Sequence, residues 1–131
     1  MEYSRLGQSD IKVSRICIGC MGFGVPVPGG HQWTLDYEST KTILKYALEK
    51  GINFFDTAMA YSGGTSEEFV GRALQELTTR DQVVIATKYT PRLPNQLTEI
   101  GGGDWIRQCL DNSLKRLGTD HVDLYIMHSW D

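Results

Sequence analysis

The chain has 131 residues, of which 40% are hydrophobic and 22% are charged, and its formal net charge at pH 7 is −3. This composition is typical of one soluble globular domain, and a chain of this length buries roughly two thirds of its unfolded surface. The mildly acidic balance argues against binding to nucleic acid, which requires a basic surface. A nucleic-acid partner is therefore not expected.

Membrane and secretory signals are also missing from the sequence. No apolar run approaches the ~20 residues that span a bilayer, and no apolar segment follows residues 1–5 as it does in a secretory signal. Cys17, Cys20 and Cys109 are too few, and odd in number, for a disulfide framework, so the expected compartment is the reducing cytoplasm. Cys17 and Cys20 lie three apart on an extended segment and point to opposite faces, so core thiols are favoured over a shared metal site.

The first predicted elements are two short extended segments at residues 3–6 and 11–14, which the intervening turn residues join into a β-hairpin. Apolar runs typical of β-strands then recur along the chain, at residues 16–18, 52–55, 83–86 and 122–127. Each run is separated from the next by an amphipathic stretch with helical spacing.

The first amphipathic stretch predicts a helix over residues 35–50, with Thr34 as its N-cap and Gly51 just past its C-terminus. The second helix is expected to begin at Thr65. Glu68, three residues later, completes the pattern of a capping box.

The third helix is predicted from about residue 104 to 117, with Gly118 ending it. Alternating strands and helices predict an α/β fold with a parallel sheet. Long loops at residues 22–33 and 91–103 follow the carboxyl ends of strands, where parallel α/β proteins place their active sites. Residues 31–33 are candidates to line a substrate pocket.

Three of the predicted strands end in an ionisable residue. Asp56, Lys88 and His128 follow successive apolar runs. Because adjacent strands lie about 4.8 Å apart, these side chains are expected to converge at one rim, with Tyr61 folding back over it. Taken singly, each residue has an ordinary structural explanation as a helix cap, a solvated rim residue or a packing tyrosine. The joint pattern favours chemistry.

The chemistry that these residues support is activation of a carbonyl group. An aspartate keeps a neighbouring lysine charged, and the ammonium stabilises the charge that a tyrosine acquires when it gives up its proton. Tyr61 is then a general acid, and His128 donates a hydrogen bond to the same carbonyl oxygen. Hydride from a nicotinamide completes the reduction.

At these residues the sequence resembles the aldo-keto reductase superfamily. The resemblance covers essentially the whole chain and is carried by residues 51–58 with Tyr61, 66–68 followed by Gly71, 84–88, and 117–125 leading to His128. It implies an NADP(H)-dependent oxidoreductase that reduces aldehydes or ketones to alcohols on a (β/α)8 barrel.

By this resemblance Asp56, Tyr61, Lys88 and His128 form the catalytic tetrad, with Tyr61 as the proton donor. Cys20 and Met21, together with Asp56, match positions that contact the nicotinamide end of the cofactor. No metal is implied.

A (β/α)8 barrel is typically about 250 residues long. Residues 1–131 are therefore expected to form the N-terminal part of a single barrel domain, namely the hairpin and the first four parallel βα strands, with the C-terminal half absent from this sequence. Because such a half-barrel exposes an apolar face and two strand edges, it is expected to associate with a copy of itself or with a separate C-terminal half.

Two alternatives remain open. A truncated or non-catalytic half-barrel would act as a binding or assembly module. A metal-dependent barrel hydrolase would also place His and Asp at strand ends, although such enzymes generally use paired histidines, and the three histidines here are unpaired.

Overall fold

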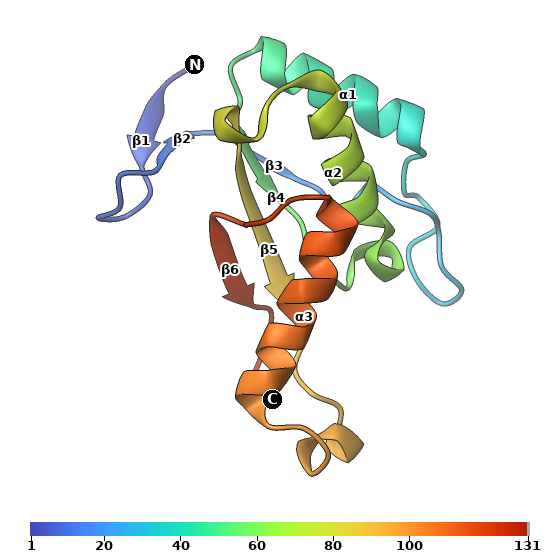
Figure 1. The fold of residues 1–131 in the computed structure, drawn as a ribbon. Coiled ribbons are helices and arrows are strands. Elements are labelled where there is room, and N and C mark those ends of the chain that lie inside the picture. Colours follow the sequence, from blue (N-terminus) through green and yellow to red (C-terminus); the bar gives the residue numbers. More distant parts are fainter. Residues whose placement is uncertain (131) are drawn as a thin grey trace.

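The computed structural model describes residues 1–130 (Figure 1). Strands β1 and β2 form an antiparallel hairpin, and the other four strands form a parallel sheet in the order β3-β4-β5-β6. The strands are β1 Tyr3–Arg5, β2 Lys12–Ser14, β3 Cys17–Gly19, β4 Phe54–Asp56, β5 Val84–Tyr89 and β6 Leu124–Met127. The α-helices are α1 Tyr37–Glu49, α2 Thr65–Leu77 and α3 Gly102–Leu117, and the short 3₁₀ turns are η1 Tyr61–Gly64, η2 Arg80–Gln82 and η3 Pro94–Leu97. The predicted hairpin and the four parallel βα strands are thus confirmed.

Hydrogen bonds join the hairpin to the amino-terminal end of the parallel sheet. The Tyr3 hydroxyl donates to the carbonyl of Gly51 at 2.7 Å. The Asn53 side chain accepts from the backbone N–H of Ser14 at 2.7 Å and donates to the carbonyl of Lys12 at 3.0 Å. These bonds occupy the end of the sheet opposite to Asp56, so the carboxyl ends of the strands remain open.

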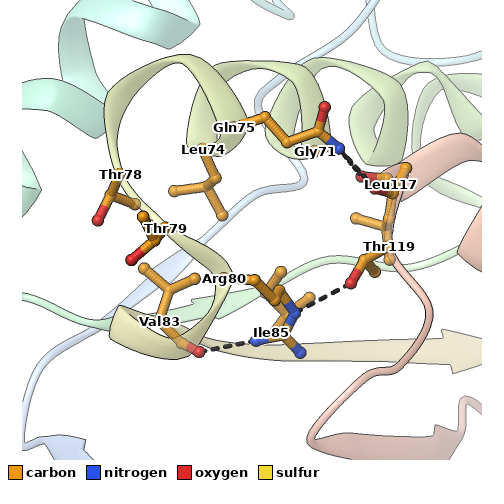
Figure 2. Close-up of a pocket in the computed structure, with 11 residues that line it drawn as sticks. Gly71, Leu74, Gln75, Thr78, Thr79, Arg80, Val83, Ile85, Leu117 and Thr119 are labelled. Atoms are coloured by element: carbon orange, nitrogen blue, oxygen red, sulfur yellow. Dashed lines mark hydrogen bonds between the residues drawn. The ribbon is translucent and has the colours of Figure 1, made fainter.

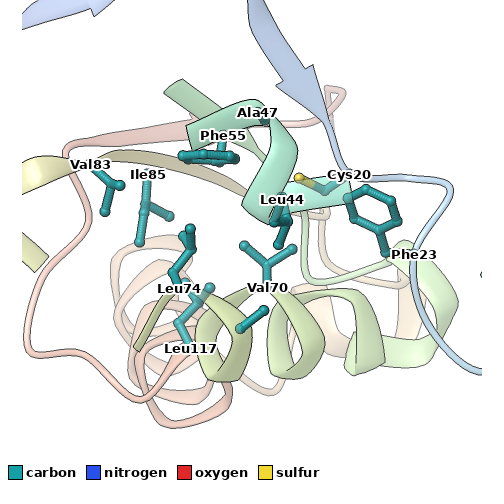
Figure 3. Close-up of a cluster of buried hydrophobic side chains, with 11 residues drawn as sticks. Cys20, Phe23, Leu44, Ala47, Phe55, Val70, Leu74, Val83, Ile85 and Leu117 are labelled. Atoms are coloured by element: carbon teal, nitrogen blue, oxygen red, sulfur yellow. The ribbon is translucent and has the colours of Figure 1, made fainter. Parts of the chain in front are cut away.

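The hydrophobic core lies between the parallel sheet and the three helices (Figure 3). Phe55 and Ile85 project from the sheet toward Leu44 of α1 and Val70 of α2. Phe55, Leu44 and Val70 are fully buried, and each such side chain contributes about 1.5–3 kcal/mol to folding.

The other face of the sheet, the inner face, lies away from the three helices. Strand register pairs Phe54 with Val84 and Asp56 with Ala86, so these residues share the face that points away from the helices. Cys17 pairs with Phe54 on the same face and is exposed. The expectation that both Cys17 and Cys20 are core thiols is therefore wrong for Cys17, because the helices cover only the opposite face.

Two glycines end helices as predicted. Gly51 has φ +81° after α1, and Gly118 has φ +65° after α3. Both adopt the left-handed conformation that glycine tolerates best.

The predicted helix starts need correction. Helix α1 is capped by Asp36, whose Oδ1 accepts from the Ser39 N–H at 2.9 Å, and not by Thr34. Helix α2 has Gly64 as its N-cap, without a side-chain capping bond, so the capping box between Thr65 and Glu68 is absent.

Helices α1 and α2 are joined by an ion-pair cluster around Glu76, whose side chain is 35% exposed. Its carboxylate accepts from Lys41 of α1 at 2.5 Å and from Arg72 at 3.0 Å. The hydrogen bonds from Lys41 and then Arg72 lower the pKa of Glu76 from 4.5 to about 2.

This shift predicts a pH-dependent part of the stability. Because the pKa of Glu76 is depressed in the folded state, its contribution is fully present above pH 4.5 and is lost as the pH falls toward about 2. We expect Glu76→Gln to flatten the slope of the unfolding free energy against pH in that window, measured by urea unfolding. The exposed Glu49 provides the control, and an equal flattening in Glu49→Gln would contradict the prediction.

Candidate functional site

The register of the sheet brings the three predicted strand-end residues onto one face. Asp56 pairs with Ala86, and Lys88 lies two residues further along β5. Lys88 pairs in turn with Ile126, and His128 lies two residues beyond it. Because alternate strand residues share a face, Asp56, Lys88 and His128 all belong to the inner face.

The Lys88 ammonium is the centre of the site. Its Nζ donates to Asp56 Oδ2 at 2.9 Å, to the Thr57 carbonyl at 2.8 Å and to the Tyr61 hydroxyl at 3.3 Å. The Lys88 side chain is only 13% exposed. Burial by itself lowers the pKa of Lys88, but the hydrogen bonds to Asp56 and Tyr61 outweigh it and raise the pKa above its usual value. Lys88 is therefore held in the charged form.

His128 lies against the Tyr61 ring. The two rings meet edge to face, with centroids 5.6 Å apart at 84°. The His128 backbone N–H donates to the Tyr89 carbonyl at 2.9 Å, which continues the pairing of β5 with β6 beyond the last strand residue. The four residues predicted to converge do so.

Tyr61 is presented by a strained turn. Ser62 has φ +49°, and the two glycines that follow it are also left-handed. The turn is held because the Thr65 hydroxyl donates to the Ser62 carbonyl at 2.7 Å and accepts from the Val25 N–H at 2.8 Å. Gly24 lies so close that a Cβ there would sit 2.6 Å from the Ser62 side chain. The segment 22–25 therefore fixes the turn that carries Tyr61.

A hollow of about 350 Å³ opens beside the Tyr61 ring, and His128 forms another wall of it. Met21 and His31 also line it, and the His31 ring packs on Trp33 at 4.7 Å between centroids. Of residues 31–33, His31 lines this hollow. Met21 is 41% exposed there.

Cys20 is placed differently from Met21. It is fully buried in the core, and its thiol donates to the Ile18 carbonyl. Its backbone N–H donates to the Asp56 carbonyl, and its own carbonyl accepts from the Ser66 hydroxyl. The Cys20 thiol therefore faces the core and not the hollow.

Two contributors to the site were not identified from the sequence. The Thr57 carbonyl accepts from Lys88, and the Thr57 hydroxyl meets Ser66 Oγ at 3.0 Å in the buried layer behind it. Ser66, a polar residue on the inward side of the predicted second helix, was the feature of the sequence that could have pointed to this buried contact.

A second cavity, of about 270 Å³, lies between α2, α3 and the amino-terminal end of β5 (Figure 2). At its edge the Arg80 guanidinium already donates to Thr119, to the Val83 carbonyl and to Asp123. This cavity is at the opposite end of β5 from Lys88 and has no part in the cluster around Tyr61.

Residues 1–130 contain no group of three or more His, Cys, Asp or Glu side chains arranged to hold a metal ion. None of the helices in the same range combines the length and apolar character needed to cross a membrane.

Comparison with known proteins identifies the family. Residues 15–131 match the aldo/keto reductase family. The chain is 40% identical over 129 residues to the aldo-keto reductase YhdN of Bacillus subtilis (strain 168), which covers 98% of this chain and 38% of that protein. It is 37% identical over 150 residues to the versiconal hemiacetal acetate reductase of Aspergillus parasiticus, which covers 100% of this chain and 43% of that protein. The chain belongs to the aldo/keto reductase family and spans about two fifths of the length of these relatives.

Solved structures agree with the sequence match. A thermostable aldo-keto reductase, Tm1743, in complex with the inhibitor epalrestat superposes with a TM-score of 0.80 at 31% identity, covering 100% of this chain and 44% of that one. An aldo-keto reductase from Klebsiella pneumoniae in complex with NADPH gives a TM-score of 0.70 at 29% identity, covering 92% of this chain and 37% of that one. The predicted fold, half of an aldo-keto reductase barrel, is confirmed. The matched proteins are named as reductases, which is the class of enzyme that the resemblance in the sequence implies.

Proposed function

We propose that this chain carries the proton-transfer part of a carbonyl reductase site, at which an aldehyde or ketone is reduced to an alcohol with NADP(H). The observation that carries the proposal is the position of the Lys88 ammonium, which donates to both the Asp56 carboxylate and the Tyr61 hydroxyl. A partly buried cation in contact with a phenol is the arrangement that allows a tyrosine to release its proton.

Each residue then has one role. Tyr61 transfers its proton to the carbonyl oxygen of the substrate, and Lys88 stabilises the phenolate that remains. Asp56 keeps Lys88 charged and directed at Tyr61. His128, beside the Tyr61 ring, donates to the same oxygen and stabilises the negative charge that develops on it.

The residues around the hollow fit a nicotinamide. When bound, the reduced nicotinamide supplies the hydride that adds to the carbonyl carbon. The hollow lies directly against Tyr61, and Met21 offers it an exposed apolar side chain. Met21 and Asp56 would hold the nicotinamide end, while Cys20 would support that wall from the core. The Klebsiella pneumoniae relative in complex with NADPH supports the choice of NADP(H).

Residues 1–130 supply one wall of the cleft that so large a cofactor needs, and tight binding requires burial of most of its surface. We therefore expect weak NADPH binding and slow turnover by this chain. Further βα units, from a copy of the chain or from another segment, would close the barrel by pairing with the edge strands β3 and β6.

The test is consumption of NADPH by the purified chain with a panel of aliphatic and aromatic aldehydes and ketones. We expect slow, carbonyl-dependent oxidation of NADPH with matching alcohol formation, unchanged after exhaustive chelation. Activity that is lost on chelation and restored by zinc or manganese would favour a metal hydrolase instead. A rate equal to the protein-free blank would contradict the proposal for this chain.

A further inference from the structure

A buried carboxylate outside the proposed tetrad remains unexplained by the reaction. Glu67 of α2 is completely buried. Its Oε1 accepts from the Thr87 hydroxyl at 2.5 Å, and its Oε2 accepts from Arg116 Nε at 2.6 Å. Burying a carboxylate costs several kcal/mol unless it is paired and hydrogen-bonded, as Glu67 is. An apolar residue would fill the same space in the core without this cost.

The two partners of Glu67 connect it to the strand that carries Lys88. Thr87 directly precedes Lys88 on β5, and because successive strand residues point to opposite faces, Thr87 faces the helices while Lys88 faces the site. Thr87 is itself completely buried. The Thr87–Glu67 bond therefore ties this part of β5 to α2.

The same carboxylate also acts on the turn that carries Tyr61. The Arg116 side chain of α3 packs against Gly64, the last residue of that turn, so closely that a Cβ on Gly64 would lie 2.8 Å from Arg116 Cδ. Arg116 is held in place by Glu67 and by the Ser113 hydroxyl at 3.2 Å. One ion pair thus contacts the end of the Tyr61 turn and, through Thr87, the strand of Lys88.

We propose that Glu67 is a positioning residue, which sets the distance between the Lys88 ammonium and the Tyr61 hydroxyl by fixing β5 and the Tyr61 turn against each other. This inference rests on the proposed function for its purpose. The predicted distance can be measured without cofactor, substrate or turnover. The test of Glu67 can therefore succeed or fail whether or not the proposed function is correct.

The test is an NMR experiment on the full chain that follows the cross-peak between the Lys88 side-chain methylenes and the Tyr61 ring. Lys88 Nζ lies 4.9 Å from the centroid of that ring, so the wild type should show the cross-peak. Thr87→Val keeps the shape of the side chain but removes the bond to Glu67. Glu67→Asp keeps the charge but shortens the side chain, so that it reaches only one of its two partners. We expect the cross-peak to be lost in both variants.

The matched control is Thr40→Val, which removes an equally buried threonine hydroxyl from α1, where it donates to the Asp36 carbonyl at 2.7 Å, remote from the site. The control should keep the cross-peak while losing comparable stability in urea. If Thr87→Val does not fold, Glu67→Asp decides. A cross-peak that persists in the folded variants, or that is lost equally in Thr40→Val, would overturn the proposal.

Discussion

Replacing Tyr61 by phenylalanine should lower the rate of carbonyl reduction by about 100-fold or more, the contribution expected of a general acid. The phenylalanine ring retains the edge-to-face contact with His128 and the position above Lys88. It loses only the hydroxyl, which accepts from Lys88 at 3.3 Å. Cofactor affinity should change little, because the ring that faces the hollow is preserved.

The measurement is the turnover number and the NADPH dissociation constant of Tyr61→Phe beside those of the wild-type chain. Tyr46→Phe is the matched control, since Tyr46 lies exposed on α1 and the same hydroxyl is removed far from the site. Turnover close to that of the wild type in Tyr61→Phe would show that the proton comes from another group. A drop shared by Tyr46→Phe would show a general effect of the substitution.

The sequence predicted well that the strand-end residues come together. Asp56, Lys88 and His128 each terminate an apolar run, and a parallel sheet places such ends together. The apolar pattern was less accurate for strand length. Strand β5 runs to Tyr89, beyond the predicted end, because β6 continues to pair with it there.

Helix starts were harder to predict because contacts distant in sequence decide them. Threonine is a favoured residue type at an N-cap, yet the Thr65 hydroxyl accepts a hydrogen bond from the Val25 N–H, 40 residues away. Thr65 already has helical backbone angles, φ −69° and ψ −20°, whereas an N-cap residue is extended, and local sequence carries no sign of the distant partner that holds it there.

The burial of Glu67 likewise could not be predicted from local sequence. A glutamate in the first turn of a helix favours a solvated position beside the positive end of the helix dipole. In the structure it is completely buried, because Arg116 reaches it from α3, 49 residues further along the chain. Only the packing of α2 against α3 brings the two charges together.

That packing rests on Gly71, and Gly71→Ala should be the most destabilising single-methyl change in the chain. A Cβ on Gly71 would lie 2.2 Å from the carbonyl oxygen of Leu117 and 2.6 Å from its Cα. These are backbone atoms, so no side chain can move aside and the two helices must separate. Separation would also weaken the bonds from the Gln75 amide to the carbonyls of Leu117 and Gly118, at 3.2 and 2.6 Å.

We expect Gly71→Ala to lower the free energy of unfolding by at least about 3 kcal/mol, the upper part of the range for overpacked cores, measured by urea unfolding. Gly103→Ala is the matched control, because Gly103 is an exposed residue of α3 and its added Cβ would meet only the tip of the Arg107 side chain at 3.5 Å. That change should stabilise the chain by about 0.5–1 kcal/mol, since alanine is the better helix former. A loss in Gly71→Ala of under about 1 kcal/mol would mean that α2 and α3 can shift apart at little cost. The close approach of the two helices would then not be what holds Glu67 and Arg116 together.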